Sequence, residues 1–199
     1  MKVILMEYTN EPEFLGAFAA EVCHTSDIYN IDGREDKALL KKILKLGHLS
    51  VLEHISFTFL ISGISRVTTH QLVRHRMASY SQQSHRYTKI KEKDFICPPS
   101  IQSNKEAYSL FQKNIKDNLD AYNKLIEMGI KKEDARYLIP QAVTSTIMMT
   151  MNARELLHFF KLRCSKRAQW EIRQLANEML RLAKEKAPVI FENVDEVKE

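Results

Sequence analysis

The segment of residues 74–86 carries side chains that are well suited to chemistry on an anion. It contains three arginines, two histidines, three serines and two glutamines, and it has neither an acidic residue nor a lysine. An arginine guanidinium can hold two phosphate oxygens at once, and interleaved hydroxyl and amide groups suit a ligand of defined shape. The segment therefore indicates a binding site for a multiply charged anion.

Composition alone leaves two other functions open for this segment. Arginine-rich stretches are commonly solvated surface or nucleic-acid-binding patches. In a nucleic-acid-binding domain, Tyr80 and Tyr87 would stack on bases. In a helical assembly module, the segment would have no role of its own. A steep loss of affinity with salt would indicate nucleic-acid binding.

The spacing of the histidines does not predict a metal site. His70 and His75 are five residues apart, and His48 and His54 are six apart. Neither pair would project from one side of a helix, as a zinc pair four residues apart does. No pattern of cysteines or acidic residues completes such a site, so we expect no bound metal ion.

The chain of 199 residues is long enough for one domain with a buried core. Its formal net charge of +5 favours phosphorylated partners without requiring nucleic acid. The sequence has no Gly-x-Gly-x-x-Gly turn and no P-loop, which argues against a Rossmann or nucleoside-triphosphate site. Cys23, Cys97 and Cys164 are scattered, which favours reduced thiols and a cytoplasmic location. We expect no signal peptide, and no apolar run approaches the ~20 residues that cross a membrane.

Hydrophobic periodicity predicts the elements that must position the charged segment. We expect strands at residues 3–8, 56–62 and 144–151. We expect amphipathic helices at residues 10–22, 37–46, 65–73, 103–129, 152–161 and 170–186. A helix over 65–73 would aim Gln71 and Arg74 the same way. The apolar stripe of the long helix, which is either core or a subunit interface, consists of Tyr108, Phe111, Ile115, Leu119, Tyr122 and Ile126.

Local signals set the ends of several of these elements. Capping boxes that begin at Ser50 and Ser103 predict two helix starts, and Asn10 and Asn152 are expected to cap two more. Gly47 should end a helix. The remaining signals are a strand end at Gly63, a turn at Asp32-Gly33 and a frayed acidic tail beyond Pro188.

An extended conformation for residues 84–87 would give the charged segment a compact phosphate grip. Side chains two residues apart on an extended chain project to one side. Ser84 and Arg86 would then present a hydroxyl and a guanidinium together, with His85 on the other side. Two unrelated surface residues are the alternative interpretation.

The order of residues in the segment resembles the signature of flavin-dependent thymidylate synthases. The matching positions are Arg74, His75 and Arg76, then, after a gap of seven residues, Ser84 and Arg86, with Ser79 at the first serine. Residues 47–54, which read Gly-His-Leu-Ser-Val-Leu-Glu-His, match a second family segment. The resemblance covers most of the chain and is strongest over residues 47–89 and 134–172.

The resemblance implies an enzyme that reductively methylates dUMP to dTMP. The carbon would come from 5,10-methylenetetrahydrofolate and the hydride from FADH2, which NADPH regenerates. The implied fold is α/β (α+β), with a central mixed or antiparallel sheet flanked by long helices, in a single domain over residues 1–199. The implied assembly is a homotetramer with active sites at subunit interfaces. It would have small-molecule substrates and would engage neither nucleic acid nor a membrane.

The resemblance also implies roles for individual residues. Arg163 would be catalytic, because its charge would stabilise negative charge that develops on the uracil ring. The implied dUMP-binding residues are Gln71, Arg74, Gln82, Ser84, Arg86, Arg136 and Arg163. The implied FAD-binding residues are Ser50, Arg74, His75, Arg76, Gln82, Asn152, Arg154 and His158.

A few positions depart from the family pattern. His158 stands where asparagine is frequent, and Arg167 stands where histidine is frequent. Ser81 and Gln82 replace an asparagine and a glutamate. The non-flavin class of thymidylate synthase uses a cysteine that follows a proline, whereas Cys97 precedes one, so no nucleophilic cysteine is predicted. The spacing shows no base that could activate Ser84 as a nucleophile, so we expect this serine to have a binding role.

Overall fold

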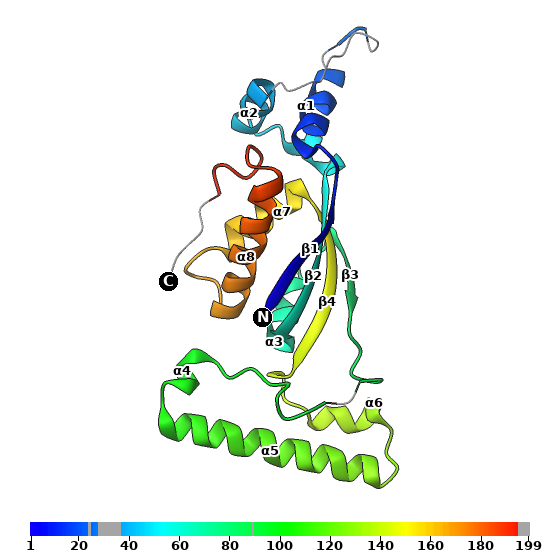
Figure 1. Cartoon of the computed structure of the whole chain (residues 1–199), viewed down its shortest axis with the longest axis vertical. Helices are drawn as coiled ribbons and strands as arrows, with labels where there is room; N and C mark the ends of the chain where they lie inside the picture. The colour runs from blue at the N-terminus through cyan, green and yellow to red at the C-terminus, as the bar shows by residue number, and fades with distance from the viewer. Residues whose placement is uncertain (24, 28–36, 89, 195–199) are drawn as a thin grey trace. The chain divides into compact units, whose positions relative to one another are not determined.

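The computed structural model describes residues 1–23, 25–27, 37–88 and 90–194. The strands are β1 (Lys2–Tyr8), β2 (Ser56–Ser65), β3 (Ala78–Gln82) and β4 (Thr144–Asn152), as Figure 1 shows. The α-helices are α1 (Pro12–Val22), α2 (Lys37–Lys45), α3 (Arg66–Leu72), α4 (Pro99–Gln102), α5 (Lys105–Glu127), α6 (Lys132–Ala135), α7 (Ala153–Arg163) and α8 (Trp170–Lys186). Two 3-10 helices are η2 (Leu49–His54) and η3 (Arg136–Leu138). None of these described helices combines the length and the apolar character that crossing a membrane requires.

The strands form one four-stranded antiparallel sheet in the order β1-β2-β4-β3. The prediction of an α/β fold is therefore confirmed. Of the mixed and antiparallel sheets that the sequence left open, the structure has the antiparallel sheet. Alternate side chains on β2 and β4 are buried, as a sheet with one covered face requires. Phe57, Phe59 and Ile61 of β2 are fully buried, and Ile147 and Met149 of β4 are too.

Contacts within the chain divide it into two compact units. Unit 1 consists of residues 1–2, 62–71 and 81–147, and unit 2 consists of residues 3–61, 72–80 and 148–199. Each strand of the sheet contributes residues to both units. The single domain over residues 1–199 stays a prediction.

Unit 2 holds a core of aromatic side chains beneath its helices. Helix α7 contacts α8 and η2, and α1 contacts α2 and η2. Phe191 packs edge-on against Phe57 at 5.7 Å between ring centroids and against Phe160 at 5.6 Å. Edge-on aromatic pairs combine a large buried area with favourable quadrupole contacts. The apolar face of residues 170–186 is buried in this core, and α8 has the predicted bounds.

Unit 1 is organised by the long helix α5, which contacts α4, α6 and η3 (Figure 1). Ile115 and Tyr122 of the predicted stripe are buried, and its other members are half-buried. This stripe therefore contributes to packing within the chain. The helix begins after Asn104, whose side-chain oxygen accepts hydrogen bonds from the backbone N–H groups of Glu106 and Ala107, each at 3.1 Å.

The two capping boxes that the sequence predicts, at Ser103 and Ser50, do not form. Ser103 does not cap α5, because it ends the short helix α4 and its hydroxyl donates to the carbonyl of Ser100 at 3.2 Å. Ser50 does not cap η2, which begins after His48 without a side-chain cap. Instead Gly47, at φ 76°, turns the chain directly from α2 into η2.

The other differences concern ends of elements. Asn10 does not cap α1, because Glu11 takes the left-handed cap position at φ 48°. Gly63 does not end β2, which continues to Ser65. The structure confirms β1, β4, the glycine that ends α2 and the cap of α7 by Asn152. The predicted turn at residues 32–33 lies outside the described residues, as do residues 195–199 of the acidic tail.

Candidate functional site

The turn after α3 presents the Arg-His-Arg motif with its histidine inward and its arginines outward. His75 is 5% exposed, whereas Arg74 and Arg76 are exposed to solvent. Neither arginine has a hydrogen bond or ion pair with another described residue. Both guanidinium groups are therefore available to an anion. Helix α3 ends at Leu72, so the prediction that Gln71 and Arg74 share a helical face is wrong.

The hydroxyl of Tyr80 anchors this turn from inside unit 2. It lies 2.9 Å from the carbonyl oxygen of Leu72 and 2.8 Å from that of His75. Burial, and secondarily the charge of Glu155, raises the pKa of Tyr80 well above its usual range. The phenol therefore stays protonated and donates to these carbonyls, which fixes the backbone of the motif.

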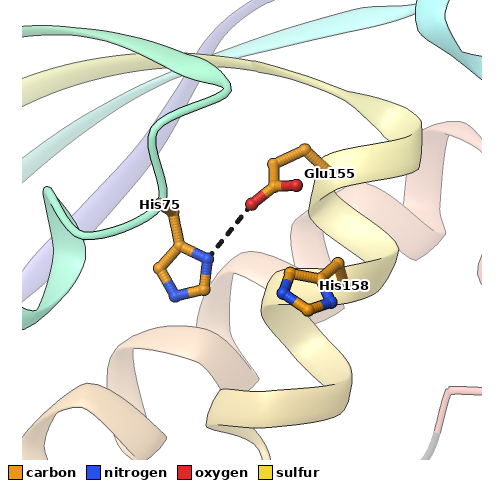
Figure 2. A group of neighbouring side chains, drawn as sticks. All are labelled: His75, Glu155 and His158. Atoms are coloured by element: carbon orange, nitrogen blue, oxygen red, sulfur yellow. Dashed lines mark hydrogen bonds and ion pairs between the residues drawn. The ribbon is translucent and has the colours of Figure 1, made fainter.

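His75 joins the motif to helix α7 through both ring nitrogens. Its Nδ1 lies 3.2 Å from Oε1 of Glu155, as Figure 2 shows. Its Nε2 accepts a hydrogen bond from Nε of Arg163 at 3.1 Å. Burial lowers the pKa of His75 below its ordinary value, and the charges of Arg163 and His158 lower it further, against an opposing effect of Glu155. His75 is therefore neutral near pH 7.

His75, Glu155 and His158 together form a cluster that the spacing of the histidines did not predict. Their potential ligand atoms lie within 4.8 Å of one another in the described part of the chain (Figure 2). Spacing along the sequence could not reveal this cluster, because His75 and Glu155 are 80 residues apart. The one available signal was Glu155-x-x-His158, which places two polar side chains on one face of a helix.

A pocket of about 590 Å³ lies in unit 2 beside this cluster. Its lining residues are Leu49, Glu53, Met77, Asn152, Arg154, Glu155, Leu157, His158 and Lys161. The acidic groups in the lining are both engaged, because Glu53 pairs with Arg154 and Glu155 contacts His75. The size is typical of a pocket for a small molecule or cofactor. Ser50, the other predicted cofactor residue of η2, is exposed.

Gln82 is held by two hydroxyl groups in unit 1. Its Nε2 donates to Oγ1 of Thr69 and to Oγ of Ser145, each at 3.1 Å. Gln71, at the end of α3, is half-buried. The amide nitrogen of Gln82 therefore has a fixed direction, and its side-chain oxygen, which has no hydrogen bond within the described part of the chain, can meet a ligand.

Residues 84–87 form a turn, so the condition for a phosphate grip built from an extended segment is not met. The backbone N–H of Tyr87 donates to the carbonyl of Ser84 at 3.2 Å, and that of Arg86 donates to the Ser84 hydroxyl at 3.3 Å. The Arg86 guanidinium pairs with Glu133 through Nη2 at 2.6 Å and Nε at 3.0 Å. Nε of Arg136 donates to the carbonyl of Glu133 at 3.1 Å. An anion at Arg86 would have to displace or share this carboxylate.

The predicted site residues divide between the two units largely by their implied ligand. The residues expected to bind FAD all belong to unit 2 except Gln82. The residues expected to bind dUMP all belong to unit 1 except Arg74 and Arg163. Within unit 2 the structure brings His75 to Arg163, and Asn152, Arg154 and His158 to one pocket.

Comparison with known proteins identifies the class. The family model described as "Thymidylate synthase complementing protein" matches residues 4–189. A flavin-dependent thymidylate synthase of Geobacter sulfurreducens is 50% identical over 200 residues, covering 96% of this chain and 85% of the relative. The enzyme of the same name from Clostridium tetani is 44% identical, with the same coverage, and that from Pyrococcus abyssi is 46% identical, covering 90% and 78%. The chain belongs to the flavin-dependent thymidylate synthase family.

Proposed function

We propose that this protein is an enzyme that reductively methylates dUMP to dTMP. In this proposal 5,10-methylenetetrahydrofolate donates the carbon, and FAD, reduced by NADPH, supplies the hydride. The observation that carries the proposal is the link between the motif and α7. His75 binds Arg163 at 3.1 Å, while Arg74 and Arg76 keep exposed guanidinium groups on either side of His75. Family membership and this arrangement of cations both support a site for phosphorylated ligands.

The donor chemistry of unit 2 fits a flavin dinucleotide. The pyrophosphate of FAD is anionic, and Arg74 and Arg76 have no acidic partner among the described residues. Asn152, Arg154 and His158 line the pocket of about 590 Å³ and bring further polar groups. In our proposal these residues, with Ser50, His75 and Gln82, hold FAD. The protein's own contribution is to bind and orient the cofactor.

The nucleotide would be held by cations and amides from both sets of predicted residues. In our proposal Gln71, Gln82, Ser84, Arg86 and Arg136 bind dUMP together with Arg74 and Arg163. The charge of Arg163 would stabilise negative charge on the uracil ring while C5 acts as the nucleophile. Arg163 suits this task because it is half-buried, where a fixed charge acts more strongly than in water.

We further propose that the enzyme is a homotetramer of the cytoplasm with active sites between subunits. The assembly rests on the family resemblance. The location is supported by Cys23, Cys97 and Cys164, none of which forms a disulfide in the described part of the chain, as a reducing compartment favours. Light scattering on the purified protein tests the assembly. A mass of four chains is expected, and a monomer at micromolar concentration would contradict it.

The reaction is tested with purified protein reconstituted with FAD. We expect a flavin spectrum and formation of dTMP that requires dUMP, methylenetetrahydrofolate and NADPH together. Omission of each component in turn is the control. If the reconstituted protein neither retains FAD nor forms dTMP, the proposal is wrong.

The structure fits the nucleic-acid-binding alternative at Tyr87, whose side chain is exposed, but not at Tyr80. That interpretation uses Tyr80 and Tyr87 as stacking platforms. Tyr80 is half-buried with its hydroxyl bound to the carbonyls of Leu72 and His75, so its ring is held in place within unit 2. Arg86 is engaged by Glu133. The alternative predicts a colourless protein whose affinity for single strands falls steeply with salt.

A further inference from the structure

We propose that Glu155 and His75 are positioning residues that fix the guanidinium of Arg163. Glu155 holds the imidazole proton of His75 on Nδ1, so that Nε2 is left as the acceptor for Nε–H of Arg163. The role of Arg163 in turnover rests on the function proposed above. The two hydrogen bonds that connect Glu155, His75 and Arg163, which we call the relay, do not depend on that function.

The direction of the relay follows from which atoms carry hydrogen. Nε of arginine always carries one hydrogen and cannot accept. At 3.1 Å from Nε of Arg163, Nε2 of His75 must therefore be the acceptor and must lack a hydrogen. A neutral imidazole then has its hydrogen on Nδ1, which points at Oε1 of Glu155 at 3.2 Å. Both contacts are satisfied by one tautomer only.

The surroundings leave the ring of His75 little freedom to rotate. The edge-on ring of Phe159 lies 4.9 Å away between centroids, and the His75 side chain is 4% exposed. The carbonyl of His75 accepts from the Tyr80 hydroxyl at 2.8 Å, which fixes the backbone as well. A ring held on both sides transmits the position of Glu155 to Arg163.

The relay uses only one nitrogen of Arg163. Its two terminal nitrogens have no hydrogen-bond partner among the residues that the structure describes. An arginine guanidinium offers its terminal N–H groups in a rigid planar fork. With Nε tied to His75, the plane of that fork is set before a ligand arrives, which lowers the entropic cost of binding.

The same cluster of His75, Glu155 and His158 resembles a metal site in composition, and the relay argues against one. A cation on Nδ1 of His75 would force the ring hydrogen to Nε2. That hydrogen would then face Nε–H of Arg163 across 3.1 Å. A cation on Nε2 would displace Arg163 itself. In either case a divalent ion would lie close to a guanidinium charge.

Nitrogen-15 NMR of the histidine-labelled protein tests the relay directly. The two ring nitrogens of a neutral imidazole differ strongly in chemical shift according to which one is protonated. The His75 signals are assigned by their loss in a His75→Gln variant, because the chain has seven histidines. We expect the wild-type protein at pH 8, without substrates, to show His75 protonated on Nδ1 only. An Nε2-protonated or mixed tautomer would overturn the proposal without any variant of Glu155.

Two variants of Glu155 then test its part in the relay. Glu155→Gln keeps an oxygen that can accept from Nδ1, so we expect the tautomer and kcat to stay close to wild type. Glu155→Ala removes the acceptor, so we expect a mixed tautomer and a kcat lower by roughly tenfold, with kcat expressed per bound flavin because Glu155 lines the pocket proposed for FAD. The glutamine variant also controls for the lost charge in the first turn of α7. Wild-type behaviour of the alanine variant, or equal loss in both variants, would overturn the role of Glu155.

One equivalent of Zn²⁺ added to the wild-type protein separates the relay from a metal site. We expect the His75 signals to stay unchanged. Stoichiometric binding with a shift of these signals would overturn the relay in favour of a metal site. Because the tautomer is measured without substrates, absence of dTMP formation would contradict the proposed function and leave the relay standing.

Discussion

At the scale of single residues, the arginines of this chain differ in what occupies their guanidinium groups. Arg86 and Arg154 are paired with the carboxylates of acidic residues. Arg74 and Arg76 have no such partner among the described residues, although they are as exposed. Arg163 is intermediate, because its Nε is bound to a neutral histidine and it has no ion-pair partner among the residues that the structure describes. Free guanidinium charge, and not arginine content, therefore marks where an anion would bind.

Arg163 is expected to act on the reaction and not on the cofactor. Arg163→Ala removes the charge that would stabilise the activated uracil, so we expect kcat to fall by about a hundredfold or more. The flavin content should stay at the wild-type level, because Arg163 belongs to the predicted nucleotide set. Turnover is measured as dTMP formed, and flavin by absorbance after desalting. Retained turnover would remove the assigned role.

Arg76 is expected to act on the cofactor. Arg76→Ala removes an uncompensated guanidinium next to the buried His75, so FAD should dissociate more readily, by roughly tenfold in Kd. The measurement is a titration of the protein without flavin by FAD fluorescence. Arg181→Ala is a matched control, because Arg181 is a surface arginine of the same unit that pairs with Glu178 and Glu185. Equal affinity in the Arg76 and Arg181 variants would count against the assignment.

At the scale of elements, helix starts decide where several site residues lie. Asn152 caps α7 by accepting a hydrogen bond from the backbone N–H of Glu155 at 2.8 Å. This cap places the first turn of α7, with Glu155, and the second turn, with His158, against the pocket of unit 2. Because the Asn152 side-chain oxygen is used by the cap, only its amide N–H groups are available to a ligand.

Removal of this cap is expected to affect stability and cofactor binding together. Asn152→Ala should lower the free energy of unfolding by about 1 kcal/mol, as loss of a side-chain cap does. It should also weaken FAD binding. Asn104→Ala is the matched control, because Asn104 caps α5 in unit 1 and belongs to no predicted site. The control should lose similar stability in urea and keep its FAD affinity. Equal losses of FAD in both would mean that the effect is general destabilisation.

At the scale of the whole molecule, each unit buries one of its described histidines at a polar contact. His75 lies in unit 2, and His85 of unit 1 donates from Nε2 to the carbonyl of Thr144 at 3.1 Å. Burial lowers the pKa of both histidines, and nearby arginine charges lower each further, with Arg66 and Arg136 acting on His85. Both are therefore neutral in the folded protein at pH 7.

Stability is expected to fall on mild acidification because of these two histidines. A lowered pKa in the folded state means that the unfolded chain takes up the proton more easily. The stabilising contribution is therefore full above the ordinary pKa of about 6.5 and is lost as the pH falls from there through the folded pKa. The test is the urea midpoint at pH 7.5 and 5.5, with a lower midpoint expected at pH 5.5. His85→Gln should make the dependence shallower, and an unchanged midpoint in the wild type would contradict the expectation.

The sequence determined most elements and the family of this protein. Strong periodicity over residues 170–186 gave a helix with the bounds that the structure shows, and alternation over residues 144–151 gave a strand. These signals are local, because burial of one face repeats every turn of a helix or every second residue of a strand. The residues of the Arg-His-Arg motif identified the family in the same way, through their order alone.

Only the tertiary structure decided which charges are used within the chain and which remain free. The pairing of Arg86 with Glu133, and the relay from Glu155 through His75 to Arg163, join residues 47, 80 and 88 positions apart. Two local expectations failed for the same reason. Ser103 ends the preceding helix α4 and does not cap α5, and residues 84–87 form a turn and are not extended. Hydrogen bonds and ion pairs depend on distances in space, and spacing along the chain does not contain those distances.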